Sequence, residues 1–162
     1  MVVSNTSPLV YLAELGDFEV LRDLFGKIVI PRAVFREIAV GGAGLPVAHS
    51  VQGAMASWLS VKDVANTTET ERFLQAGLHP GESEAIVLAA ELASEALLMD
   101  DSDGVKFAAA AGANVIRTPG IYRLAKERGF VRAVRPKLDN LREAGFWLRD
   151  EHYRMVLESL GE

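Results

Sequence analysis

Polar and acidic side chains recur where apolar runs of this sequence end, or within the first turns of the helices predicted to follow. The residues concerned are Asn5, Ser7, Glu37, Glu82, Glu84, Asp100, Asp101 and Asp103. Bringing several carboxylates together costs free energy unless an opposite charge offsets their repulsion. Mg²⁺ and Mn²⁺ supply that charge and prefer oxygen ligands, and Mg²⁺ commonly needs only one or two carboxylates besides water and substrate phosphate. The pattern therefore indicates a cation site that can activate water and neutralise charge on a phosphodiester.

Each of these acids, taken alone, also fits a purely structural role. The helix dipole favours Asp and Glu in the first turn of a helix. Asp101 and Asp103 can also cap the helix that follows them. A zinc site is disfavoured, because the chain has no cysteine and its three histidines show no ligand spacing.

Short apolar runs alternate with longer segments of helical periodicity along the whole chain. The predicted strands cover residues 2–3, 27–31, 58–64, 95–101 and 114–118. Helices are predicted over about 8–15, 17–25, 32–39, 47–57, 66–77, 79–93, 103–111, 119–129, 134–145 and 150–160. This alternation predicts one α/β domain over 1–162, a three-layer α/β/α sandwich with a mainly parallel central sheet and a C-terminal helical extension at about 134–162. In such sheets the functional crevice lies beyond the carboxyl ends of the strands, where most of the polar clusters fall.

The net charge of −5 hides an uneven distribution of charge. Residues 1–116 carry 7 basic and 15 acidic side chains, whereas residues 117–162 carry 10 basic and 7 acidic ones. This asymmetry fits a metal site beside a phosphate-binding surface, or simply solvated helix faces. The chain shows no signal-peptide pattern, no apolar stretch long enough for a bilayer and no cysteine, so we expect a cytoplasmic protein without membrane attachment.

Three segments, taken in order, resemble the PIN-domain superfamily, in particular its stand-alone prokaryotic branch. They are "VVSNTSPLVYLAELGDFEVLRDLFGKIVIPRAVFREI", "PGESEAIVLAAELASEALLMDDSDG" and "ANVIRTPGIYRLAKERGFV". The resemblance extends over essentially the whole chain, including the "VRPKLDNLREAGFWL" tail. It implies an α/β/α sandwich and a Mg²⁺- or Mn²⁺-dependent endoribonuclease. It also implies RNA as a substrate, a small antitoxin protein as a possible partner of a toxin-like subunit, and possible homodimerisation.

The resemblance assigns catalytic and metal-binding roles to residues that match the family pattern. These are Asn5, Glu37, Glu84 or Glu82, Asp100, Asp101 and Asp103. Glu82 and Glu84 point to different sides of a helix, so only one is expected at the metal, and the run "EAIVLA" favours Glu84. Ser7, Arg117 and Lys126 are expected to contact the nucleic acid.

Asn5 departs from the family pattern, in which an Asp is usual at this position. An amide oxygen can ligate a metal ion but brings no charge, so the resemblance implies a weakened metal site. The alternative is a catalytically inactive PIN-like module that binds nucleic acid or a protein without cutting.

Overall fold

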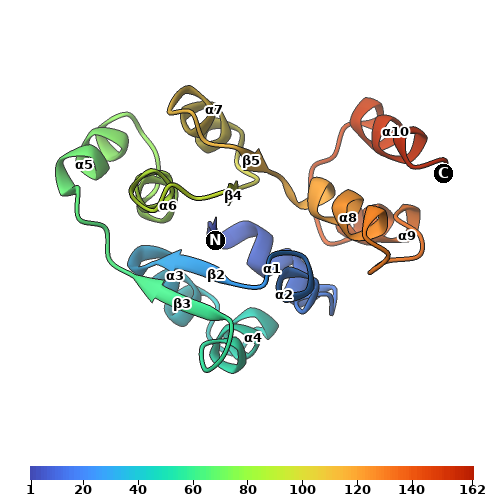
Figure 1. The fold of residues 1–162 in the computed structure, drawn as a ribbon, viewed down its shortest axis with the longest axis horizontal. Coiled ribbons are helices and arrows are strands. Elements are labelled where there is room, and N and C mark those ends of the chain that lie inside the picture. Colours follow the sequence, from blue (N-terminus) through green and yellow to red (C-terminus); the bar gives the residue numbers. More distant parts are fainter.

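A computed structural model describes all residues from 1 to 162, and a parallel sheet forms its centre (Figure 1). The sheet has five strands in the order β3-β2-β1-β4-β5, and every pairing is parallel. The strands are β1 Val2–Ser4, β2 Ile28–Pro31, β3 Leu59–Lys62, β4 Ala96–Leu98 and β5 Val115–Ile116. Each lies within or beside a predicted strand, because short runs of Val, Ile and Leu suit a strand that is buried on both faces.

Ten helices connect and cover the strands. They are α1 Thr6–Glu14, α2 Val20–Phe25, α3 Arg32–Gly41, α4 Pro46–Ala54, α5 Thr67–Gln75, α6 Pro80–Glu91, α7 Ser102–Ala110, α8 Thr118–Glu127, α9 Arg135–Glu143 and α10 Asp150–Ser159. Proline occupies one of the first two positions of α4, α6, α8 and α9, where its missing N–H costs no helical hydrogen bond. The predicted helices therefore exist, with ends shifted by a few residues.

The two faces of the sheet belong to two separate apolar cores. Val2, Ile28 and Leu98 contribute to a cluster of 27 buried residues that also involves α1 to α4 and α8 to α10. Val3 and Leu97 point the other way, into a cluster of 12 buried residues with α5, α6 and α7. Successive strand residues face opposite sides, so a continuous apolar run serves both cores. The three-layer α/β/α sandwich predicted from the sequence is confirmed.

The order of the strands places the switch point of the sheet between β1 and β4. The chain runs outward from β1 to β2 and β3 on one side, and β4 and β5 lie on the other. Ser4 pairs with Leu98 at the carboxyl ends of the two central strands. In open parallel sheets the crevice at such a point is the usual binding site, and the residues that follow β1 and β4 are Asn5 and the Met99–Asp103 segment.

The C-terminal helices are packed into the larger core and tied to α8 by charged contacts. Leu138, Leu141 and Leu157 belong to the core of 27 residues. The side chain of Glu162 accepts hydrogen bonds from Lys126 Nζ at 2.7 Å and from the backbone N–H of Val134 at 2.8 Å. Together these contacts fix α9 and α10 against α8.

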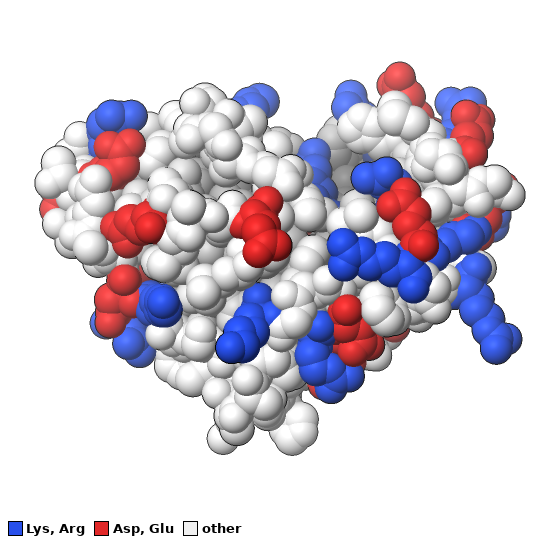
Figure 2. Space-filling model, in the orientation of Figure 1, with Lys and Arg blue, Asp and Glu red and all other residues white.

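Several basic residues of the C-terminal segment are paired with acidic side chains in the same way. Lys137 pairs with Asp17 at 2.8 Å, Arg142 pairs with Asp150 at 2.9 Å, and Lys126 pairs with Glu162. Basic and acidic side chains are interspersed over the face shown in Figure 2.

Compared with the length and hydropathy that a membrane span requires, none of the helices meets both requirements.

Candidate active site

A polar pocket opens at the carboxyl end of β1, between the first turn of α1, the middle of α3 and the start of α6. Its volume is about 400 Å³, and none of its lining residues is hydrophobic. The lining residues are Asn5, Thr6, Ser7, Glu37, His79, Pro80 and Glu82. Four of the residues singled out from the sequence, Asn5, Ser7, Glu37 and Glu82, therefore meet here although they are far apart in the chain.

Asn5 directly follows β1 and is held there by its backbone N–H, which donates to Leu98 O at 2.9 Å. Asn is a favoured helix cap, but this side chain makes no capping hydrogen bond to α1. Asn5 is only 4% exposed, and its Oδ1 is one of two buried side-chain polar atoms without a hydrogen-bond partner, Ser83 Oγ being the other. A buried acceptor without a partner costs about 1–3 kcal/mol. A cation or a bound water would remove that cost.

Glu37 connects three helices at the pocket. Its Oε1 accepts a hydrogen bond from the N–H of Gly81 at 2.9 Å, and its Oε2 accepts one from the hydroxyl of Thr6. Gly81 allows this approach, because a Cβ at that position would lie 2.5 Å from Glu37 Oε1. The carboxylate is thereby oriented by α1 and α6 before any ligand arrives.

Glu82 lies in the first turn of α6 and is 8% exposed. Its Oε2 accepts a hydrogen bond from the N–H of His79 at 3.0 Å, which forms part of a capping box at the start of the helix. Burial raises the pKa of Glu82, and the negative charges of Asp101 and Glu37 raise it further, against the opposing effects of the His79 N–H and the His79 side chain. The charges of Asp101 and Glu37 thus disfavour the ionised form of Glu82, and a bound divalent cation would offset that effect.

Asp100 is buried beside the site, and both of its carboxylate oxygens are already in use. Oδ1 accepts from the N–H of Thr118 and Oδ2 from the Thr118 hydroxyl, both at 2.7 Å. Burial raises the pKa of Asp100, while these two hydrogen bonds and the charge of Arg117 lower it. Asp100 therefore joins the end of β4 to the start of α8.

Asp101 follows immediately and serves as the N-cap of α7. Its Oδ1 accepts hydrogen bonds from Asp103 N at 3.0 Å and Gly104 N at 2.9 Å, which is the capping role that its position in the sequence allowed. Its Oδ2 makes no hydrogen bond in the structure. Asp101 thus combines a capping role with one free oxygen near Glu82.

The other residues selected from the sequence lie outside the pocket. Glu84 accepts a hydrogen bond from Ala33 N at 2.8 Å and so caps the start of α3, which leaves Glu82 as the residue of this pair that lines the pocket. The side chain of Asp103 is 77% exposed and lies 3.8 Å from Lys106. Lys126 is engaged by Glu162, and Arg117 donates to the carbonyl of Asp100.

Thr6 and His79 were not selected from the sequence, yet both contribute to the pocket. Thr6 could have been found from the sequence because it lies between two selected residues, Asn5 and Ser7. His79 could have been found because it lies three residues before Glu82, which is the spacing of a capping box.

The oxygen donors at the pocket fit Mg²⁺ or Mn²⁺. No group of three or more His, Cys, Asp or Glu side chains is arranged to hold a metal ion by itself. Mg²⁺ needs only one or two carboxylates and keeps several waters. The unpaired Asn5 Oδ1, with Glu37 and Glu82 on the same pocket, supplies a donor set of that kind.

Replacing Thr118 by valine is expected to lower the free energy of unfolding by about 1–3 kcal/mol. The change keeps the shape of a fully buried side chain but removes the hydroxyl that donates to Asp100 Oδ2. Urea denaturation measures the loss, with Thr68→Val on the exposed face of α5 as the control. Equal stability of the two variants would show that the contact between Asp100 and Thr118 does not hold β4 to α8.

Comparison with known proteins places the chain in a family. A family profile described as the PIN domain matches residues 1–162. A solved PilT N-terminus domain protein from the hyperthermophilic archaeon Sulfolobus solfataricus P2 superposes with a TM-score of 0.58 at 21% identity, over 78% of this chain and 92% of that protein. At that identity the likeness supports the fold alone. No curated protein matches the sequence. Because the profile covers the full length, the chain belongs to the PIN-domain family.

Proposed function

We propose that this protein is a Mg²⁺- or Mn²⁺-dependent endoribonuclease whose active site is the polar pocket at the end of β1. The proposal rests mainly on one observation, the buried Asn5 Oδ1 that lacks a partner in a pocket shared with Glu37 and Glu82. The PIN-type, nuclease-like fold supports it, as does the position of the pocket at the switch point of a parallel sheet.

The residues of the pocket have distinct parts in this proposal. Asn5, Glu37 and Glu82 would hold the ion, with Asp101 beside them and Asp100 positioning the segment after β4. The ion, when bound, lowers the pKa of water and neutralises charge on the phosphodiester. Thr6 and Gly81 fix the Glu37 carboxylate, and the N–H of His79 fixes Glu82, so the ligands need little rearrangement. The Ser7 hydroxyl lines the same pocket and can donate to a phosphate oxygen.

Cleavage of single-stranded RNA by the purified protein tests the proposal. We expect Mn²⁺- or Mg²⁺-dependent cleavage that EDTA abolishes and that falls at least about a hundredfold in Glu37→Gln, the range seen when one electrostatic group is removed from an active site. The control is Glu71→Gln, which removes an exposed carboxylate of α5 far from the pocket in sequence. Thermal unfolding of both variants separates lost activity from lost fold.

Undiminished cleavage by a folded Glu37→Gln variant would reject this site, and cleavage that persists in EDTA would reject the metal dependence.

Asn5 itself favours the second candidate function, a PIN-like module that binds nucleic acid or a protein without cutting. A neutral amide provides one charge fewer than the acid that the family resemblance leads us to expect, so such a site would bind its ion more weakly. Repression by a small antitoxin protein would fit either function and remains part of the proposal. An adjacent small reading frame whose product binds this protein would support that role.

A further inference from the structure

A second, larger cavity lies between α7, the β5–α8 junction, the loop between α9 and α10, and α10 itself. Its volume is about 500 Å³, and its twelve lining residues include Lys106, Arg117, Arg149 and His152 but no Asp or Glu. Figure 2 shows this surface hollowed between the parts of the molecule formed by α7 and by α10, with basic atoms on the wall. The chain has 22 acidic and 17 basic residues, so a cavity whose titratable groups are all basic is unusual and favours an anionic ligand.

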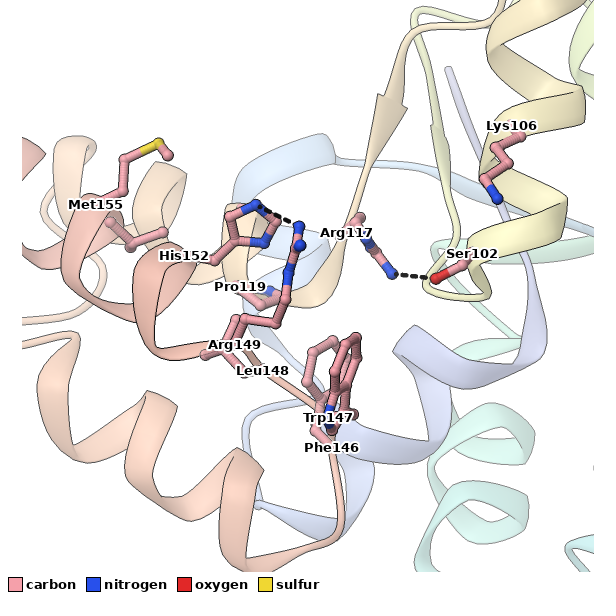
Figure 3. A pocket seen from close by; sticks show the side chains of 12 residues that line it. Ser102, Lys106, Arg117, Pro119, Phe146, Trp147, Leu148, Arg149, His152 and Met155 are labelled. Atoms are coloured by element: carbon pink, nitrogen blue, oxygen red, sulfur yellow. Dashed lines mark hydrogen bonds between the residues drawn. The ribbon is translucent and has the colours of Figure 1, made fainter.

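Trp147 projects into the opening of this cavity (Figure 3). It is 79% exposed, whereas the other tryptophan of the chain, Trp58, is 8% exposed. A single exposed aromatic residue needs no special explanation on an ordinary surface. Here the indole lies in a concave site among cations, so a flat ligand can stack on it.

The loop that carries Trp147 is held in place from several sides. Phe146 is buried and packs edge-to-face against Tyr11 with ring centroids 5.1 Å apart. Arg142 donates to Leu148 O at 2.7 Å, and its guanidinium lies 4.3 Å from the ring centroid of Tyr153. Because its neighbours are anchored inward, Trp147 is kept outward without collapse onto the core, which lowers the entropic cost of binding.

The two guanidinium groups of the cavity are oriented by hydrogen bonds, whereas Lys106 is paired with Asp103 at 3.8 Å. Arg149 Nη2 donates to His152 Nε2 at 3.2 Å, and Arg117 Nη2 lies 3.4 Å from Ser102 Oγ. Figure 3 shows the side chains of Arg117 and Arg149 reaching toward the same open space as Trp147. Neither guanidinium forms a salt bridge to a carboxylate, so both are available to phosphate groups.

The cavity is connected to the active-site side of the sheet through the segment that follows β4. Arg117 donates to the backbone carbonyl of Asp100, and Ser102 belongs to the cavity wall directly after Asp101. Thr118, the partner of Asp100, precedes Pro119 on the same wall. A polymer lying across the carboxyl ends of the strands would therefore meet both sites.

We propose that this cavity binds a nucleotide of single-stranded RNA, with its base stacked on Trp147 and its flanking phosphates on Arg117 and Arg149. Proteins commonly bind single-stranded nucleic acid by stacking its bases on aromatic side chains and placing its phosphates in a basic groove. A duplex keeps its bases stacked on one another and cannot present a free face. The inference deepens the proposed ribonuclease function, because it names the form of RNA and the residues that hold it beside the site of cleavage.

Binding measured without metal tests the inference separately from cleavage. The probe is a fluorescently labelled oligouridine of about ten nucleotides in EDTA. We expect Trp147→Ala to weaken binding about ten- to hundredfold, and Trp147→Phe to retain part of the affinity. Arg149→Gln should weaken binding and reduce its salt dependence by about one phosphate contact. The matched control is Arg154→Gln on α10, the helix that Arg149 immediately precedes, because Arg154 lies beside Glu151 and Glu158, outside the cavity.

The outcomes separate this inference from the proposed catalysis. Tight binding that is the same in Trp147→Ala, Arg149→Gln and Arg154→Gln would overturn the inference and leave the nuclease site untouched. Loss of binding in Trp147→Ala, together with no cleavage by the wild type in Mn²⁺, would support the inference and reject the nuclease. A response of Trp147 fluorescence to an oligoglutamate peptide but not to oligouridine would identify a protein-docking site and overturn it. Absence of any RNA binding by the wild type would overturn both proposals.

Discussion

Asn5→Asp is expected to tighten Mn²⁺ binding about tenfold, or by ~1.4 kcal/mol, and to lower the melting temperature of the metal-free protein. Asn5 is 4% exposed and shares its pocket with Glu37 and Glu82. A third carboxylate in this space is repelled by the other two, so the metal-free variant should melt about 2–4 °C lower for each ~1 kcal/mol of repulsion. A bound divalent ion converts the same charge into attraction. The sign of the effect on stability therefore depends on the metal.

Thermal unfolding with and without Mn²⁺, together with titration calorimetry, measures both halves of this expectation. Asn66→Asp is a suitable control, because Asn66 caps α5 through Oδ1 and an aspartate can accept the same hydrogen bond from Glu69 N. Metal should have no effect on the melting temperature of that control beyond its effect on the wild type. An Asn5→Asp variant that binds no Mn²⁺, in a protein whose wild type binds none either, would favour the non-cutting module over the nuclease.

The architecture could be predicted from the sequence because each element carries its own local signal. The run "KIVIP" ends in a proline, which is the last residue of a strand. The run "HPGE" combines a proline with a capping-box glutamate at the start of a helix. Such signals depend only on residues a few positions apart, and they are largely sufficient to predict a buried strand or the start of a helix. The placement of the polar residues after β1 and β4 followed from the general position of crevices in parallel sheets.

The exact partners of the acids could not be predicted, because they are set by contacts between distant parts of the chain. Glu82 and Glu84 both open α6, and the sequence pattern favoured Glu84 at the pocket. The structure directs Glu84 to Ala33 N, 51 residues away, and leaves Glu82 on the pocket. Asp100 likewise uses both oxygens on Thr118, 18 residues further on. A carboxylate at a helix start satisfies the same local rules in either role, so only the packing of α3 and α8 decides between them.

The basic C-terminal segment shows the same limit. Its excess of Lys and Arg suggested a phosphate-binding surface, with Lys126 as one contact. In the folded chain Lys126, near the end of α8, forms a salt bridge with Glu162, which follows α10. The cations left facing an open cavity include Arg149, which lies outside the stretch with the densest positive charge. Charge counts along the chain cannot distinguish a residue that ties two helices together from one that faces solvent.

Glu82→Gln is expected to stabilise the metal-free protein at pH 7 while abolishing its response to metal. The pKa of Glu82 is raised by burial and by the charges of Asp101 and Glu37. A carboxyl group whose pKa is higher in the folded than in the unfolded state releases its proton less readily when folded, so it lowers stability as the pH rises from the ordinary glutamate range through the raised value. Above that value the penalty is complete. Glutamine carries no charge at any of these pH values and avoids it.

The variant keeps the local structure, because the amide oxygen of glutamine can accept the hydrogen bond that Glu82 takes from His79 N. The melting temperature should therefore rise at pH 7, by about 2–4 °C for each ~1 kcal/mol of penalty that the substitution removes. The gain should shrink as the pH falls toward 4, the ordinary range of glutamate. Glu71→Gln, at an exposed position, controls for the loss of one negative charge. A variant less stable than the wild type at pH 7, or one that still gains stability from Mn²⁺, would mean that Glu82 is a structural cap. Higher stability together with a lost response to metal is the result expected when a charged group destabilises the fold but is needed for function.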